Sequence, residues 1–319
     1  MANQKFFLCC AGLMVLAVLG QFLGGGYGAK LMIWISIAAL VASSLRFVML
    51  IGELNFATAA FYGIGAYTAG LVTTQFEWPF LIAFLAGGVV AALVSLMFGF
   101  ITLRTKGPYF LLIGFAFTEV MRIIYTKSDL LGGSSGMVGI FAPEMLDAYL
   151  TPFVILVSGL LIGGLYLVEV SNLGKIFTAI KDNENVVRSV GIRAHLSKVV
   201  CFVIASFAVG IAGSLHAYTN NVISPGDFGF LLSTFALAYL KVGGEEHPAG
   251  PVLGASLLIL LNALVLDAGL DEHIFYGAAI VLAMLLLPKG VVGLLGRAAQ
   301  RCGTITTRQS CGGLKDDGL

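Results

Sequence analysis

The stretch SNLGKIFTAIKDNENVVRSVGIRAHLSK, residues 171–198, is the longest polar interval between the first and last apolar runs of this 319-residue chain. On both sides of it the sequence returns to apolar runs long enough to cross a bilayer, which needs about 20 helical residues. The interval carries five basic residues against two acidic ones. Such a basic interval is typical of a cytoplasmic loop in a multi-span membrane protein.

The apolar residues of this interval recur at spacings of about three and four, which predicts a short amphipathic helix with one apolar side. They are Ile176, Ala179, Ile180, Val186, Val187, Val190 and Ile192. Gly191 is placed to end this helix in the left-handed conformation. The helix can lie on lipid headgroups or dock into a groove on a partner protein, and a solvated loop is the third interpretation.

Composition places the whole chain in a membrane. Hydrophobic residues make up 58% and charged residues 11% of the sequence, whereas a soluble domain carries about 25% charged residues. We therefore expect an all-α integral membrane protein, a polytopic bundle of about 10 transmembrane helices.

Ten apolar segments support this expectation, and the eighth is short enough to be tilted, broken or re-entrant. They are Phe6–Leu23, Leu31–Leu50, Phe56–Thr74, Phe80–Thr102, Tyr109–Tyr125, Pro152–Val170, Val199–Thr219, Phe230–Val242, Ala249–Leu266 and Ile274–Pro288. We interpret the first as a span and not as a signal peptide, because no small-residue cleavage site follows it. If two segments re-enter, the number of spans is about eight and the parity is unchanged.

Charge placement predicts the orientation. With both termini in the cytoplasm, fifteen of the eighteen lysine and arginine residues lie inside, and only Lys30, Arg122 and Lys127 lie outside. Residues 171–198 are then a cytoplasmic loop within a transmembrane domain of residues 1–296. We expect residues 297–319, a polar tail, to be disordered in the cytoplasm.

Several function classes find no support in the sequence. There is no G-x-x-x-x-G-K-[ST] for ATP, and the glycines of YGIGAYTAG lie in an apolar span with no preceding strand. The four histidines are scattered, and no cysteine has zinc-ligand spacing with one of them. We therefore expect no catalytic residue, no metal or cofactor, and no nucleic-acid partner.

Two polar sites lie within the predicted spans. Glu119 and Arg122 are three residues apart on one helix face, where they can mark a functional site or form a structural ion pair that holds two helices together. The segment GELNFATAAFYGIGAY, residues 52–67, holds Asn55, Thr58, Tyr62 and Tyr67 among small residues. These side chains either line a solute pathway or serve helix packing.

Small residues at four-residue spacing predict close helix packing. They are Gly159 and Gly163, Gly250 and Gly254, and the series Ser206, Gly210 and Ser214. Close packing suits a transport protein but does not by itself identify one.

Several segments, taken in order, resemble one family. They are GELNFATAAFYGIGAYTAGL from residue 52, LRTKGPYFLLIGFAFTEVMR from residue 103, LLGGSSGMVGI from residue 130, GKIFTAIKDNENVVRSVGI from residue 174, and the later Pro225, Gly243–Gly244, Gly250–Pro251 and Gly254. Together they are similar to LivM-type permease subunits of the branched-chain amino acid ABC importers, and the similarity runs along most of the chain.

The resemblance implies a role for the polar interval. Asn183, Glu184, Val186, Val187, Arg188 and Gly191 match the coupling loop through which such a permease contacts its ATPase subunit, with valines where the family usually has alanines. It also implies a second permease subunit (LivH-like), two ATPase subunits and a periplasmic substrate-binding protein, in a bacterial inner membrane. Tyr109 and Phe110, in the second resembling segment, join the candidate pathway residues.

The cargo and one alternative function stay open. The family often has Ser-Leu-Gly-His where this chain has residues 55–58, and it also carries urea, short amides and aromatic acids. Residues 243–247, GGEEH, are more acidic than the family's usual turn. A stand-alone secondary transporter or channel is the alternative to an importer subunit, with Glu119 and Arg122 as its candidate titratable pair.

Overall fold

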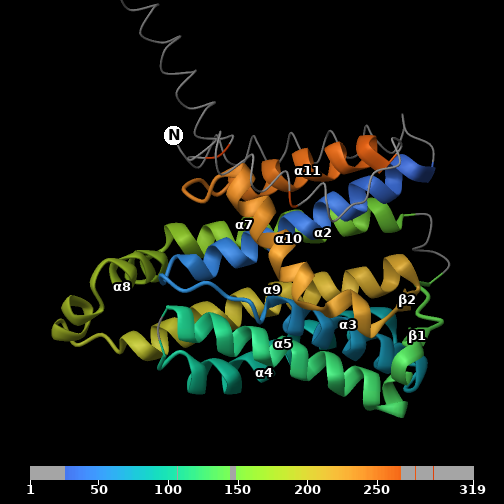
Figure 1. The fold of residues 1–319 in the computed structure, drawn as a ribbon, viewed down its shortest axis with the longest axis horizontal. Helices are drawn as coiled ribbons and strands as arrows, with labels where there is room; N and C mark the ends of the chain where they lie inside the picture. Colours follow the sequence, from blue (N-terminus) through green and yellow to red (C-terminus); the bar gives the residue numbers. More distant parts are fainter. Residues whose placement is uncertain (1–25, 106, 144–148, 267–276, 278–289, 291–319) are drawn as a thin grey trace, which may run out of the picture.

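The computed structural model describes residues 26–105, 107–143, 149–266, 277 and 290, and its architecture is a bundle of α-helices (Figure 1). The α-helices are α2 (Gly26–Met49), α3 (Thr58–Thr74), α4 (Phe80–Thr102), α5 (Pro108–Lys127), α7 (Leu150–Val170), α8 (Asn172–Ser189), α9 (Ala194–Asn220), α10 (Phe230–Gly243) and α11 (Gly250–Leu266). Short 3-10 helices η1 (Asp129–Leu131), η2 (Gly133–Ser135) and η3 (Pro225–Phe228) and two strands, β1 (Met137–Val138) and β2 (Val222–Ile223), lie between them.

The predicted apolar segments that fall in the described residues all form α-helices, and Phe80–Thr102 matches α4 at both ends. The predicted segments Phe6–Leu23 and Ile274–Pro288 and the predicted tail lie outside the described residues. Within the described part, five helices are long and apolar enough to cross a membrane: α2, α4, α5, α7 and α9. The chain is therefore an all-helical, multi-span membrane protein.

The eighth predicted segment is short, as expected. Helix α10 has 14 residues, so at about 1.5 Å per residue it is about 21 Å long, less than the roughly 30 Å of the hydrocarbon core. The chain enters it through β2 and η3, and β2 pairs antiparallel with β1 of the loop before α7. A short strand and a 3-10 helix thus stand where the first α-helical turns of a full span would be.

Small residues bring α3, α4 and α9 into close contact in the core. A methyl group added at Gly65 of α3 would lie 2.0 Å from the carbonyl oxygen of Gly210 in α9. Ser214 donates a hydrogen bond of 3.3 Å to the Gly65 carbonyl. The prediction of close packing is confirmed for this series and for Gly254, whose added methyl would lie 1.9 Å from Tyr239 O. It is wrong at Gly163, which has no described neighbour within 4 Å of that position.

A buried ion pair joins α2, α7 and the turn after α10. Arg46 binds the Glu169 carboxylate through two hydrogen bonds of 2.7 Å and donates a third, of 3.0 Å, to the Glu245 carbonyl. The Glu245 carboxylate pairs with Lys241 at 2.6 Å. These contacts account for Glu245 of the acidic turn. Burial and the Arg46 guanidinium lower the pKa of His247 in the same turn, which favours the neutral form of its imidazole.

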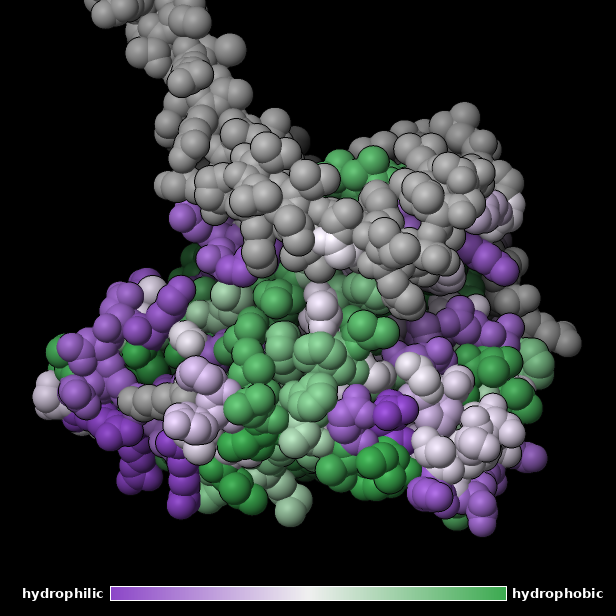
Figure 2. Space-filling model, viewed as in Figure 1, coloured by the Kyte–Doolittle hydropathy of each residue, from purple (hydrophilic) through white to green (hydrophobic). Residues whose placement is uncertain are grey.

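The two ends of the bundle differ from its middle. Helix α8 lies at one end and the β1–β2 pair at the other (Figure 1). On the face shown in Figure 2, apolar residues gather over the middle of the bundle and hydrophilic residues gather toward both ends. Exposed apolar side chains on α4, α5 and α7 include Leu93, Leu112 and Leu160. This pattern places the long axis of the bundle across the membrane.

Candidate functional site

Helix α8 has a kink that divides the predicted amphipathic helix into two parts. Asn183 has the extended backbone angles φ −158° and ψ 101° inside the helix. Its side-chain oxygen accepts hydrogen bonds from the backbone N–H groups of Asn185, at 3.0 Å, and Val186, at 3.4 Å. Asn183 therefore caps the start of a second, short helical turn, residues 184–189, because an asparagine side chain can replace a helical hydrogen-bond partner.

Gly191 ends this turn as predicted. Its φ is +87°, in the left-handed region that favours glycine, and its N–H donates a 3.0 Å hydrogen bond to the Arg188 carbonyl. We call residues 184–190 the α8 turn. It is closed by Asn183 at its start and by Gly191 at its end.

The prediction that the apolar residues share one side is wrong. Ile180, Val187 and Ala194 are buried together, with Ile176 and Ile192 packed against them. The side chains of Val186 and Val190 are instead 58% and 74% exposed. Val187 lies seven positions, about two helical turns, after Ile180 and packs in the same cluster, whereas Val186 and Val190 are exposed on another side of the turn.

The acidic residue of the α8 turn contacts two basic residues. Glu184 accepts a hydrogen bond from Arg188 at 2.5 Å through one carboxylate oxygen and pairs with Lys198 of α9 at 3.2 Å through the other. Lys198 also lies 3.7 Å from a Glu53 carboxylate oxygen in the connection between α2 and α3. The α8 turn is thereby joined to the helix bundle through charged side chains.

Asn55 and Thr58 serve the start of α3. Asn55 accepts a hydrogen bond of 3.0 Å from the Ala57 N–H, and Thr58 donates one of 2.8 Å to the Asn55 carbonyl. Both side chains are buried, with 3% and 1% exposure. These contacts satisfy non-helical backbone within the bundle, a condition that a membrane interior imposes.

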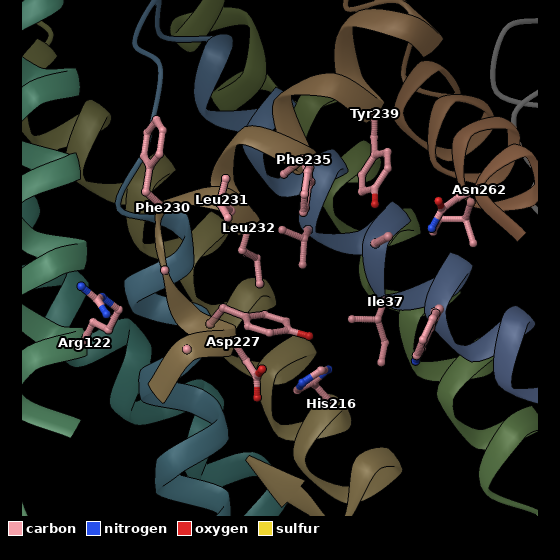
Figure 3. Close-up of a pocket in the computed structure, with 18 of the residues that line it drawn as sticks. Ile37, Arg122, His216, Asp227, Phe230, Leu231, Leu232, Phe235, Tyr239 and Asn262 are labelled. Carbon is pink, nitrogen blue, oxygen red and sulfur yellow. The ribbon is translucent and has the colours of Figure 1, made fainter. Parts of the chain in front are cut away.

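A cavity of about 580 Å³ opens among α2, α3, α5, α9, η3, α10 and α11. Most of its wall is apolar and aromatic and comes from α2 and α10, with Trp34, Phe230 and Phe235 among the lining residues. Arg122 lies on one side and Asn262 on the other, with α10 between them (Figure 3). A largely apolar cavity with a few polar groups is the usual form of a small-molecule site.

Only some of the predicted pathway residues line the cavity. Tyr62, Glu119 and Arg122 line this cavity. Asn55, Thr58, Tyr67, Tyr109 and Phe110 are not among its lining residues. The hydrophobic character of a span does not reveal which side of the helix faces a cavity, so the sequence could not make this division.

The five residues that do not line the cavity have other surroundings. Tyr67 stacks on Tyr125 with ring centroids 4.2 Å apart. Tyr109 is 71% exposed at the start of α5, whereas Phe110 is fully buried and packs on Phe202.

Glu119 and Arg122 form an ion pair within a single helix. Arg122 Nε lies 2.8 Å from Glu119 Oε2, and the side chains are 44% and 28% exposed. The pair therefore joins two positions of α5, and the interpretation that it holds two helices together stays a prediction. Its partial exposure leaves the polar atoms within reach of a solute in the cavity.

Several lining residues were not predicted from the sequence. His216 comes from α9 and Asp227 from η3, and both point toward the same part of the cavity (Figure 3). Asp227 also caps η3, where it accepts a 2.9 Å hydrogen bond from the Ser224 N–H. The PGDF segment before the short eighth apolar segment was the available signal, because non-helical backbone at membrane depth must line a cavity or lie within protein. No group of three potential metal ligands occurs among the described residues.

Comparison with known proteins decides the family. Residues 27–287 match the family described as the permease component of the branched-chain amino acid transport system. The chain belongs to this family. It is 27% identical to the high-affinity branched-chain amino acid transport system permease protein LivM of Escherichia coli (strain K12), over 91% of this chain and 75% of the relative. Identity to the LivM protein of Salmonella typhimurium is also 27%, with the same coverage. No solved structure matches the chain at a significant level.

Membership in this permease family settles the class of function. The chain is a multi-pass membrane permease component of a bacterial ABC transport system, and it is the non-catalytic transmembrane subunit. The alternative of a stand-alone secondary transporter or channel is therefore set aside.

Proposed function

We propose that the exposed face of the α8 turn is the contact through which an ATPase subunit drives this permease. The observation that carries the proposal is the pair of exposed valines, Val186 and Val190, on a turn that is capped at both ends. A small apolar surface on a rigid turn can fill a groove on a soluble partner. Arg188, with its side chain 58% exposed beside this surface, can meet acidic groups at the rim of that groove.

The charge distribution supports a cytoplasmic position for α8. Basic residues at the α8 end of the bundle, within the described residues, are Arg46, Arg104, Lys175, Lys181, Arg188, Arg193, Lys198 and Lys241. Lys30 and Lys127 lie at the end that carries the β1–β2 pair. By the positive-inside rule, the α8 end faces the cytoplasm. We infer about ten spans with both termini inside, as the sequence predicts.

We infer that the cavity is part of the solute pathway. Its apolar wall suits an aliphatic or aromatic group, and Arg122, Asp227 and His216 offer charged and hydrogen-bonding groups to the polar end of a solute. The cargo class is branched-chain amino acids or a related small amphipathic or polar solute such as urea, an amide or an aromatic acid. The importer would comprise this permease, a second LivH-like permease subunit, two ATPase subunits and a periplasmic substrate-binding protein, in the bacterial inner membrane.

Site-specific photo-crosslinking tests the role of the α8 turn. A photo-reactive residue in place of Val190 should crosslink to an ATPase subunit in the assembled importer. The same probe in place of Val138, which is 67% exposed on β1 at the opposite end, is the matched control and should not. Crosslinks from position 138 but not from position 190 would refute the proposal.

A further inference from the structure

A buried charge cluster lies beneath the α8 turn. Lys198 Nζ lies 3.2 Å from Glu184 Oε2 and 3.7 Å from Glu53 Oε1. The three side chains come from α9, α8 and the α2–α3 connection, and only 4%, 10% and 5% of their surfaces are exposed. Because buried opposite charges attract strongly and separating them is costly, the ion pairs of Lys198 hold the three segments close together.

Glu53 extends this cluster to a further helix. Its second carboxylate oxygen accepts a 3.0 Å hydrogen bond from the backbone N–H of Gly107. Gly107 has φ +61° and immediately precedes α5, so the carboxylate contacts the connection between α4 and α5. One side chain thus joins Lys198 of α9 to the start of α5.

The segment that follows Glu53 is bonded to α10. The Phe56 carbonyl accepts hydrogen bonds of 3.0 Å from Thr118 of α5 and from Ser233 of α10. Ser233 Oγ also accepts a 3.1 Å hydrogen bond from the Ala59 N–H in the first turn of α3. The rings of Phe56 and Phe230 meet edge to face at 5.2 Å. The start of α3 is therefore held against α10 by hydrogen bonds and a ring contact.

Helix α10 supplies more of the described cavity lining than any other helix. Phe230, Leu231, Leu232, Phe235, Ala236 and Tyr239 all face the cavity. Side-chain contacts link Glu184 to Lys198 and Lys198 to Glu53, the chain from Glu53 leads to Phe56, and Phe56 is hydrogen-bonded to Ser233 of the cavity-lining helix α10. Coupling between distant sites needs such a contiguous set of contacts, together with an element that changes position.

We propose that Lys198 and Glu53 are positioning residues that transmit displacement of α8 to the start of α3 and, through Ser233, to the cavity-lining helix α10. This inference rests on the proposed role of α8 as the ATPase contact. When α8 is displaced by its partner, the buried ammonium moves with Glu184 and draws the Glu53 carboxylate with it. The attraction between the two buried charges opposes their separation, so the connection that carries Glu53 moves with Lys198.

The test uses the reconstituted importer, with this chain, its second permease and its ATPase subunits in proteoliposomes. Glu53→Gln keeps the side-chain volume and can still accept the hydrogen bond from Gly107. It removes the negative charge at position 53 that faces Lys198, while the ion pair between Lys198 and Glu184 remains. We expect the same amount of bound ATPase and continued ATP hydrolysis. Solute imported per ATP hydrolysed should fall about tenfold, within the range typical of coupling between sites.

Three further variants make the result specific. Lys198→Arg keeps the charge and should retain coupling near the wild-type value. Ser233→Ala removes the hydroxyl that joins α3 to α10 and should lower uptake per ATP without any change of charge. Glu169→Gln removes another buried carboxylate, one that pairs with Arg46 of α2, and should leave uptake per ATP unchanged.

The outcomes separate this inference from the proposed function. Wild-type uptake per ATP in Glu53→Gln, or an equal loss in Glu169→Gln, would overturn the transmission role while leaving ATPase binding intact. If Glu53→Gln does not accumulate as folded protein, Ser233→Ala decides in the same assay, and wild-type coupling there overturns the inference. Failure of ATPase crosslinking at position 190 would instead overturn the proposed function.

Discussion

Substitution of Val190 by aspartate tests the proposed ATPase contact most directly. Val190 is the most exposed valine of the α8 turn, at 74%, and it directly precedes Gly191, whose φ is positive. In the free permease the new carboxylate stays in water, so we expect a change in folding free energy of no more than about 0.5 kcal/mol. Folded protein should therefore accumulate normally.

The cost of this substitution appears only on docking. If position 190 is covered by an ATPase subunit, the carboxylate is desolvated without a partner, which costs about 3–5 kcal/mol. Since about 1.4 kcal/mol corresponds to a tenfold change in affinity, binding should weaken by a few hundred- to a few thousand-fold. ATP-dependent uptake should fall with it.

The assay measures the affinity of purified ATPase for the permease in nanodiscs, together with uptake in proteoliposomes. Val138→Asp, at a similarly exposed position on β1, is the control and should change neither value. Val187→Asp is unsuitable, because Val187 is packed against Ile180 and Ala194 and a charge there would disturb the permease itself. Unchanged ATPase affinity in Val190→Asp would refute the assignment of this surface.

Three other expectations follow from the same structure. Gly65→Ala should destabilise the folded permease by about 1–3 kcal/mol, measured as a lower melting temperature in detergent, because its methyl group meets the Gly210 carbonyl at 2.0 Å; an unchanged melting temperature would contradict this packing. Glu119→Gln should leave folded protein normal and raise the KM for uptake, since the residue lines the cavity and its ion pair stays within α5; loss of folded protein with normal KM would argue for a structural role. Cysteines introduced at Ser189 and Ser134 should be labelled by impermeant reagents from opposite sides of the membrane; labelling of both from one side would refute the topology.

The sequence by itself determined the class of protein and the positions of the long apolar helices among the described residues. The segment Phe80–Thr102 matches α4 at both ends, and the short eighth segment became the short helix α10. The prediction of spans succeeds because each span must satisfy its own backbone hydrogen bonds in lipid. Its length and apolar character therefore depend only on the residues of that segment. The left-handed φ of Gly191 was also predictable from the local sequence, because glycine has no Cβ and adopts positive φ readily.

Only the tertiary structure decided which side chains meet. The periodicity of residues 176–192 predicted one apolar side, but Val187 is buried with Ile180 whereas Val186 and Val190 are exposed. Lys198 binds a carboxylate 145 positions earlier in the chain, at Glu53, and no local pattern connects the two. The rotation of each helix about its axis is set by the packing of all its neighbours, and that rotation decides whether a polar residue faces the cavity, a partner charge or the lipid.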